Sequence, residues 1–129
     1  MIHGELMDML IDHYENPRNC GAMEDADLTM SGGNSGCGDT ITVYVKLNGG
    51  EVGELSFEGK GCMVSQAAAS LISLKVKGMP VEGISAMNRD NMIEILGKEI
   101  VVRRPRCSTL ALDTLKGALL KMRAGLEDS

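Results

Sequence analysis

The clearest pattern in the chain is a strict alternation of apolar and polar residues over residues 40–47. The apolar positions are Ile41, Val43, Val45 and Leu47. A period of two is typical of a strand with one buried face. The Asn48-Gly49 pair that follows is a strong signal for a type I′ hairpin turn, and residues 51–58 return with their apolar side chains on a common face. We therefore predict an antiparallel hairpin at the centre of the fold.

Helical periodicity dominates the rest of the chain. The predicted helices cover residues 5–15, 63–77, 81–86, 88–96 and 108–124. Asn88 is placed to cap the fourth of these helices, and Gly97 to end it. In the second helix the pattern predicts a buried face made of Met63, Ala67, Leu71 and Leu74. Residues 31–39 contain four glycines and predict a loop between an extended segment at 25–30 and the hairpin.

These elements predict one α+β domain over residues 1–129, with residues 1–4 and 126–129 as flexible ends. The domain is expected to contain a small three-stranded antiparallel sheet packed with several helices, including an N-terminal helix and a long C-terminal helix. A chain of 129 residues can bury roughly two thirds of its surface, so its stability requires neither a disulfide nor a metal.

Charge and composition narrow the range of functions. Lys and Arg number 13 against 18 Asp and Glu, and the net charge of −5 argues against a nonspecific nucleic-acid or anionic-membrane binder. The three aromatic residues are too few for a platform that stacks bases or sugars. Acidic residues interrupt the N-terminal segment, and no uncharged apolar run approaches the roughly 18 residues of a membrane span. We therefore expect a cytoplasmic protein, in which cysteines serve as metal ligands or reactive thiols more often than as disulfides.

Four cysteines carry most of the chemical information. Cys20, Cys37, Cys62 and Cys107 are separated by 17, 25 and 45 residues, so the fold must assemble any site that they share. Cys37 lies in the glycine-rich loop. Cys62 and Cys107 each precede a predicted helix, and a helix N-terminus stabilises a thiolate. Asp39 lies two residues beyond Cys37, so in an extended segment both side chains point to one face.

Three thiolates and one carboxylate would suit a site that must release what it holds. A permanent iron–sulfur cluster prefers four cysteines, and a carboxylate is a weaker ligand for iron than a thiolate. The residues alone leave Asp39 equally open to a ligand role and to the role of an ordinary turn aspartate.

Four ordered motifs resemble those of the iron–sulfur cluster assembly scaffolds of the IscU, NifU and SufU type. The motifs are Asn16-Pro17-Arg18-Asn19-x-Gly21, Cys37-Gly38-Asp39, Phe57-x-Gly59-x-Gly61-Cys62 and Cys107-Ser108. The resemblance covers residues 5–122 and implies an α+β fold. It implies that a transient 2Fe–2S cluster, or zinc at the same site, is held by Cys37, Asp39, Cys62 and Cys107. It also implies a cysteine desulfurase as the sulfur donor and apo-proteins as the acceptors, for a scaffold or carrier without turnover of its own.

Departures from the family pattern bear on the partners. Arg106 stands where the bacterial and mitochondrial branch has a histidine, and that branch's Leu-Pro-Pro-Val-Lys chaperone motif reads Ile100-Val101-Val102-Arg103-Arg104. These residues argue against hand-off to a dedicated Hsp70 chaperone. The insertion that marks the SufU branch before the last cysteine is also missing. The arginines near Cys107 suit partner docking or thiolate stabilisation as well as a solvated edge, and we predict that Cys107 accepts sulfur as a persulfide.

Other interpretations stay open at this point. One is a zinc-dependent sulfur acceptor that activates a cysteine desulfurase without building a cluster, and another is a structural zinc domain. A cysteine-nucleophile hydrolase would need a base, and His3 and His13 both lie near the N-terminus. We expect Cys20 to be a buried small hydrophobe rather than a ligand, and His13 to be a core or helix-face residue. The sequence does not decide whether a homodimer shares a cluster between two chains.

Overall fold

The protein is described by a computed structural model that covers residues 3–34 and 38–128. Three antiparallel strands form one sheet in the order β1 (Leu28–Asn34), β2 (Asp39–Asn48) and β3 (Glu51–Lys60). The helices of the described residues are α1 (His3–Glu15), α2 (Met63–Lys75), α3 (Val81–Ser85), α4 (Arg89–Leu96), α5 (Lys98–Arg103) and α6 (Pro105–Asp128). This arrangement confirms the predicted α+β class, with its small sheet, N-terminal helix and long C-terminal helix.

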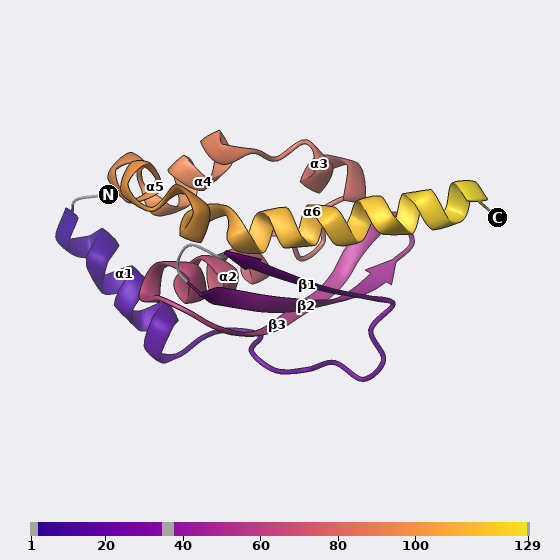
Figure 1. Ribbon diagram of the computed structural model, residues 1–129, viewed down its shortest axis with the longest axis horizontal. Helices are drawn as coiled ribbons and strands as arrows, with labels where there is room; N and C mark the ends of the chain where they lie inside the picture. The colour runs from indigo at the N-terminus through magenta and orange to yellow at the C-terminus, as the bar shows by residue number, and fades with distance from the viewer. Residues whose placement is uncertain (1–2, 35–37, 129) are drawn as a thin grey trace.

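The long helix α6 runs from beside α5 to the C-terminal end of the molecule and lies between two groups of elements (Figure 1). On one side α6 packs on β1 and β2, α2 packs on β3, and α1 packs on α2. On the other side the short helices α3, α4 and α5 contact α6 (Figure 1). Within the part of the chain that the structure describes, no helix is long and apolar enough to cross a membrane.

The central hairpin follows the predicted alternation. Its buried apolar residues are Ile41, Val43, Val45, Val52, Leu55 and Phe57. Val52 and Leu55 are both buried although they are three residues apart, because the pairing of β2 with β3 shifts between Lys46 and Leu47. Such an irregularity lets one strand keep its apolar side chains on the core face despite an extra residue.

Two local predictions around the hairpin are wrong. The turn has Gly49 and Gly50 at its centre, and only Gly49 has a positive φ, of 65°, whereas a type I′ turn needs positive φ at both positions. The glycine-rich segment is not all loop either, because residues 31–34 continue β1 and Asn34 pairs with Asp39. Glycine permits both a loop and an extended strand, so here the pairing with β2 decides.

The predicted buried face of α2 is right only in part, because Ala67 is buried and Met63 and Leu71 are partly buried, but Leu74 is not. Leu74 is 50% exposed, whereas the helix buries mostly small residues. They are Ser65, Ala67, Ala68, Ala69, Ser70, Ile72 and Ser73. Because α2 is packed against α1, α6 and β3, small side chains face its neighbours on most sides and a large residue is left outside.

The segment between α1 and β1 crosses the outer edge of β3. The N–H of Gly21 donates to the carbonyl of Phe57 at 2.8 Å, and the N–H of Phe57 donates to the carbonyl of Asn19 at 3.0 Å. From the same segment, the N–H of Arg18 donates to Ser70 Oγ at 2.9 Å. These bonds fasten residues 18–21 to both β3 and α2, and they cover part of the edge of the sheet.

Two residues of this region test the sequence analysis. Cys20 is exposed, so its prediction as a buried small hydrophobe is wrong. Its backbone forms a bridge with Phe57, which holds Cys20 at the sheet edge and leaves its side chain outside. His13 is a core residue as predicted, 6% exposed, with Nδ1 2.7 Å from Ser70 Oγ. Burial lowers the pKa of His13 below its usual value, and the charge of Arg18 acts in the same direction.

The close packing of α6 on β1 depends on the missing side chain of Gly32. A Cβ at this position would lie 2.2 Å from Thr114 Oγ1 and 3.3 Å from Thr114 Cβ. Thr114 is buried, and its hydroxyl donates to the carbonyl of Leu110 at 2.8 Å, so it cannot turn aside without losing that bond.

We expect Gly32→Ala to lower the free energy of unfolding by about 1–3 kcal/mol, because the new methyl group overpacks this contact. Gly33→Ala is the matched control: its Cβ would be 3.4 Å from the nearest atom, and we expect a change within about 0.5 kcal/mol. Urea unfolding followed by circular dichroism measures both. Adding Thr114→Ala should recover part of the loss in Gly32→Ala; equal stability of the two alanine variants would contradict this explanation.

Candidate metal centre

Three side chains with metal-ligand chemistry meet at one end of the sheet. Asp39 begins β2, Cys62 is the N-cap residue of α2, and Cys107 lies in the first turn of α6. One ligand atom of each lies within 4.8 Å of the others. Asp39 and Cys107 are each only 2% exposed, whereas Cys62 is partly exposed. The group is therefore a nearly buried site that reaches the surface on the side of Cys62.

The Asp39 carboxylate is the centre of this group. Oδ1 accepts a hydrogen bond from the backbone N–H of Cys62 at 3.1 Å. Oδ2 accepts from the thiol of Cys107 at 3.1 Å and, more weakly, from the thiol of Cys62 at 3.7 Å. Burying a carboxylate costs free energy unless hydrogen-bond donors surround it. Here the N-terminal ends of α2 and α6 supply those donors.

Gly61 makes room for this arrangement. The pairing of Thr40 with Lys60 places Asp39 beside Gly61 at the point where β3 ends. A Cβ on Gly61 would lie 2.6 Å from Asp39 Oδ1 and 2.6 Å from Ser65 Oγ. The glycine before Cys62 is therefore a requirement of the site geometry, which explains why the Gly-Cys pair belongs to the motif.

Cys107, the third residue of the group, lies at a different place from the one that the sequence predicted. Cys107 does not precede the last helix, because α6 begins at Pro105 and not at 108. Proline suits the first position of a helix, where the missing N–H has no partner to lose. The preceding helix α5 was not predicted, and its Arg103 pairs with Glu99 at 3.2 Å. Arg104 and Arg106 are exposed on the surface next to Cys107.

The structure brings together three of the four residues that the sequence analysis proposed as ligands. The fourth, Cys37, lies outside the described residues. Cys20 lies at the edge of β3. In the described part of the chain, the metal-ligand group consists of Asp39, Cys62 and Cys107 and does not include Cys20.

Sequence reasoning missed Ser65, which is 3% exposed and lies in the first turn of α2. Its hydroxyl donates to the carbonyl of Cys62 at 3.0 Å and lies 3.8 Å from Cys62 Sγ. The signal that could have found it is its position three residues after a predicted N-cap, where side chains commonly return to the cap.

The donor set fits a thiophilic metal. Two sulfurs and one carboxylate oxygen are ligands that zinc and iron accept, and three ligands leave room for a fourth. Binding would replace the thiol protons that now point at Asp39, since a metal-bound cysteine is a thiolate.

Comparisons with known proteins agree with this chemistry. The sequence model described as the NifU-like N-terminal domain matches residues 5–126. The chain is 35% identical over 113 residues to the iron-sulfur cluster assembly scaffold protein IscU 1 of Archaeoglobus fulgidus, covering 88% of this chain and 73% of that protein. It is 37% identical over 91 residues to the zinc-dependent sulfurtransferase SufU of Bacillus subtilis, covering 70% of this chain and 61% of SufU. The crystal structure of FiSufU from Fervidobacterium islandicum AW-1 matches with a TM-score of 0.74 at 27% identity, covering 87% of this chain and 94% of that chain.

We expect Gly61→Ala to weaken zinc binding by about tenfold or more, because the methyl group displaces the Asp39 carboxylate and Ser65. Competition with a chromophoric zinc chelator measures the affinity. Gly50→Ala is the control, since its Cβ would meet no atom within 4 Å. Equal zinc affinity of the two variants, with both folded by circular dichroism, would show that the Asp39 geometry does not contribute to metal binding.

Proposed function

The chain belongs to the NifU-like N-terminal domain family, and from this premise we propose that it is a scaffold on which a transient 2Fe–2S cluster is assembled and then passed to apo-proteins. The observation that carries the proposal is the convergence of Asp39, Cys62 and Cys107 from three separate elements of the fold. Relatives named as iron-sulfur cluster assembly scaffolds support the same conclusion.

In this proposal the cluster is the cargo of the protein and four side chains hold it. Cys62 and Cys107 supply thiolates from the starts of α2 and α6. Cys37 supplies the third thiolate, two residues before Asp39 in the chain. Asp39 supplies an oxygen ligand, which binds iron less strongly than sulfur does.

In this proposal the Asp39 carboxylate lowers the free-energy cost of releasing the cluster. When Asp39 leaves the iron, its Oδ1 can accept from the Cys62 N–H, and once the cluster has left and the cysteines have taken up protons, its Oδ2 accepts from the thiols, as in the structure. The alternative partners reduce the free-energy cost of losing the iron–oxygen bond. A fourth cysteine would hold the cluster more permanently.

Sulfur would arrive from a cysteine desulfurase by thiol exchange. A thiolate of this chain attacks the outer sulfur of the donor's persulfide; the new S–S bond forms here, and the donor cysteine leaves as a thiolate. Cys107 is our proposed acceptor, and its burial means that the bound partner must first expose it. Cys62 is the accessible alternative, because its side chain is partly exposed before any partner binds.

A second candidate function is a zinc-dependent sulfur acceptor that serves a cysteine desulfurase and builds no cluster. The favouring observations are the identity to a SufU named as a zinc-dependent sulfurtransferase and a donor set that zinc accepts. In that case the same thiols accept sulfur while a zinc ion stays at the site.

Anaerobic reconstitution with iron and sulfide separates the two functions. The scaffold proposal expects the visible absorption of a 2Fe–2S cluster, which apo-ferredoxin then takes up. Bound zinc that resists exchange with iron, together with stimulation of a desulfurase, would favour the sulfur acceptor. A protein that binds neither cluster nor zinc would contradict both functions.

We expect Asp39→Ala to make the reconstituted cluster more persistent and to slow its transfer to apo-ferredoxin, because the labile oxygen ligand is gone. The decay of visible absorption in the presence of a chelator measures this persistence. Asp8→Ala, at an exposed aspartate of α1, is the control and should behave as the wild type. Faster cluster loss from Asp39→Ala than from the wild type would refute the proposed role of the carboxylate.

A further inference from the structure

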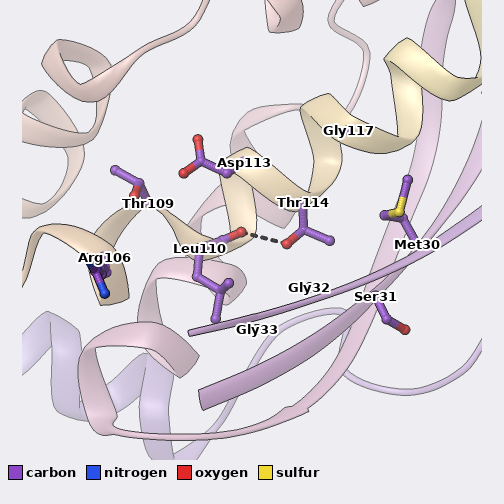
Figure 2. Close-up of a pocket in the computed structure, with 10 residues that line it drawn as sticks. All are labelled: Met30, Ser31, Gly32, Gly33, Arg106, Thr109, Leu110, Asp113, Thr114 and Gly117. Carbon is purple, nitrogen blue, oxygen red and sulfur yellow. Dashed lines mark hydrogen bonds between the residues drawn. The ribbon is translucent and has the colours of Figure 1, made fainter. Parts of the chain in front are cut away.

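A groove runs between the free edge of β1 and the first half of α6, outside the Asp39–Cys62–Cys107 group. Residues 30–33 of β1 form one side of it, and the face of α6 from Arg106 to Gly117 forms the other (Figure 2). Its volume is about 470 Å³. In Figure 2, Leu110 and Thr114 point from α6 toward the strand, so the groove floor lies where the helix meets the sheet.

The two edge strands of the sheet, β1 and β3, differ in how far other backbone segments cover them. The β3 edge is partly covered by residues 19–21, whose backbone bonds to Phe57. The β1 edge pairs only with β2 among the described residues. Exposed edges are usually protected by a lysine, a proline or a bulge, yet residues 28–33 contain neither a charge nor a proline, and their pairing with β2 is regular. This edge can therefore add a strand.

The helix beside the edge makes the groove selective for a single extended segment. An edge strand flanked by a helix is the arrangement by which PDZ domains add a peptide as a further strand, with backbone bonds to the edge and side chains against the helix. Here α6 approaches β1 closely at Gly32, so it stands beside the edge as a wall for such a segment.

Charge indicates which segment the groove accepts. Arg106 lines the groove at the end near Cys107, and the described residues give it no ion-pair partner. Asp113 is the other charged residue of the lining, and its carboxylate points away from β1 (Figure 2). Arg104 is exposed close by in the chain. Because the chain as a whole carries a net charge of −5, this unpaired guanidinium is a local attraction for a carboxylate on an otherwise acidic protein.

We propose that the β1–α6 groove binds an extended, acidic peptide segment of a partner protein by strand addition to β1, with a carboxylate of the segment on Arg106. The segment would end beside the metal group, because Asn34 pairs with Asp39 and Arg106 adjoins Cys107. The proposal concerns a docking surface that needs no metal, so it stands or falls separately from the scaffold function.

Two fluorescein-labelled peptide amides test it, Gly-Thr-Val-Glu-Val-Thr and the same peptide with Lys in place of Glu. Fluorescence anisotropy measures affinity, and amide chemical shifts of isotope-labelled protein locate the site. We expect the Glu peptide to bind about fivefold more tightly than the Lys peptide and to shift the amides of Ser31, Gly32 and Gly33. Arg106→Glu should reverse the preference, and Arg89→Glu, at an exposed arginine of α4, should keep it.

A second variant tests the groove itself. Thr109→Trp fills the space beside the α6 wall, and we expect it to abolish binding of the Glu peptide while circular dichroism shows an intact fold. The proposal is overturned if the Glu peptide shows no saturable binding up to about 1 mM, if Arg106→Glu leaves the preference unchanged, or if Thr109→Trp binds as before. It is also overturned if the same amides shift on concentration of the protein alone and sedimentation shows a dimer, because the groove would then be an interface between copies.

Discussion

The architecture at one end of the molecule depends on the buried carboxylate of Asp39. The side chain belongs to β2, yet its oxygens bond with the start of α2 and the start of α6. A buried polar group of this kind is tolerated only where hydrogen-bond donors converge on it, so the strand and the two helices are held together there. The geometry of the site is thus a property of the fold, because the Asp39 hydrogen bonds that hold β2, α2 and α6 together also position the ligand atoms.

Small residues make this convergence possible. Gly61 leaves space for the carboxylate, Gly32 lets α6 approach β1, and alanines and serines let α2 pack among its neighbours. Close backbone approach leaves little room for adjustment, since protein interiors are packed as densely as organic crystals. This density sets the position of α6, and with it the positions of both Cys107 and the wall of the β1–α6 groove.

The sequence predicts those parts of the fold whose signals are local. The alternation of β2 and the Asn88 cap of α4, which the structure shows as a capping box, are decided within a few residues. The buried face of α2 could not be predicted fully from its own sequence, because α1, α6 and β3 decide which of its side chains are covered. For the site, the resemblance to the scaffold motifs implied Asp39, Cys62 and Cys107 as ligands, but their meeting needs the register of β2 with β3 and the start of α6 at Pro105. Ser65 had one local signal, its position three residues after the N-cap of α2, whereas the open β1 edge is a tertiary feature with no separate signal in the sequence.

Exposure sets the order in which cargo can reach the ligands under the proposed function. Among the ligands that the structure describes, an incoming iron or sulfur atom meets the partly exposed Cys62 first, whereas Asp39 and Cys107 are each only 2% exposed. To reach them it must replace the hydrogen bonds that the thiols of Cys62 and Cys107 both make to one atom, Asp39 Oδ2. A thiol is a weak acceptor, but a carboxylate oxygen accepts several hydrogen bonds, so Asp39 is stabilised both with a metal and with protonated thiols. A cysteine in its place would favour only the metal-bound form, and the site would lose the balance between holding and releasing.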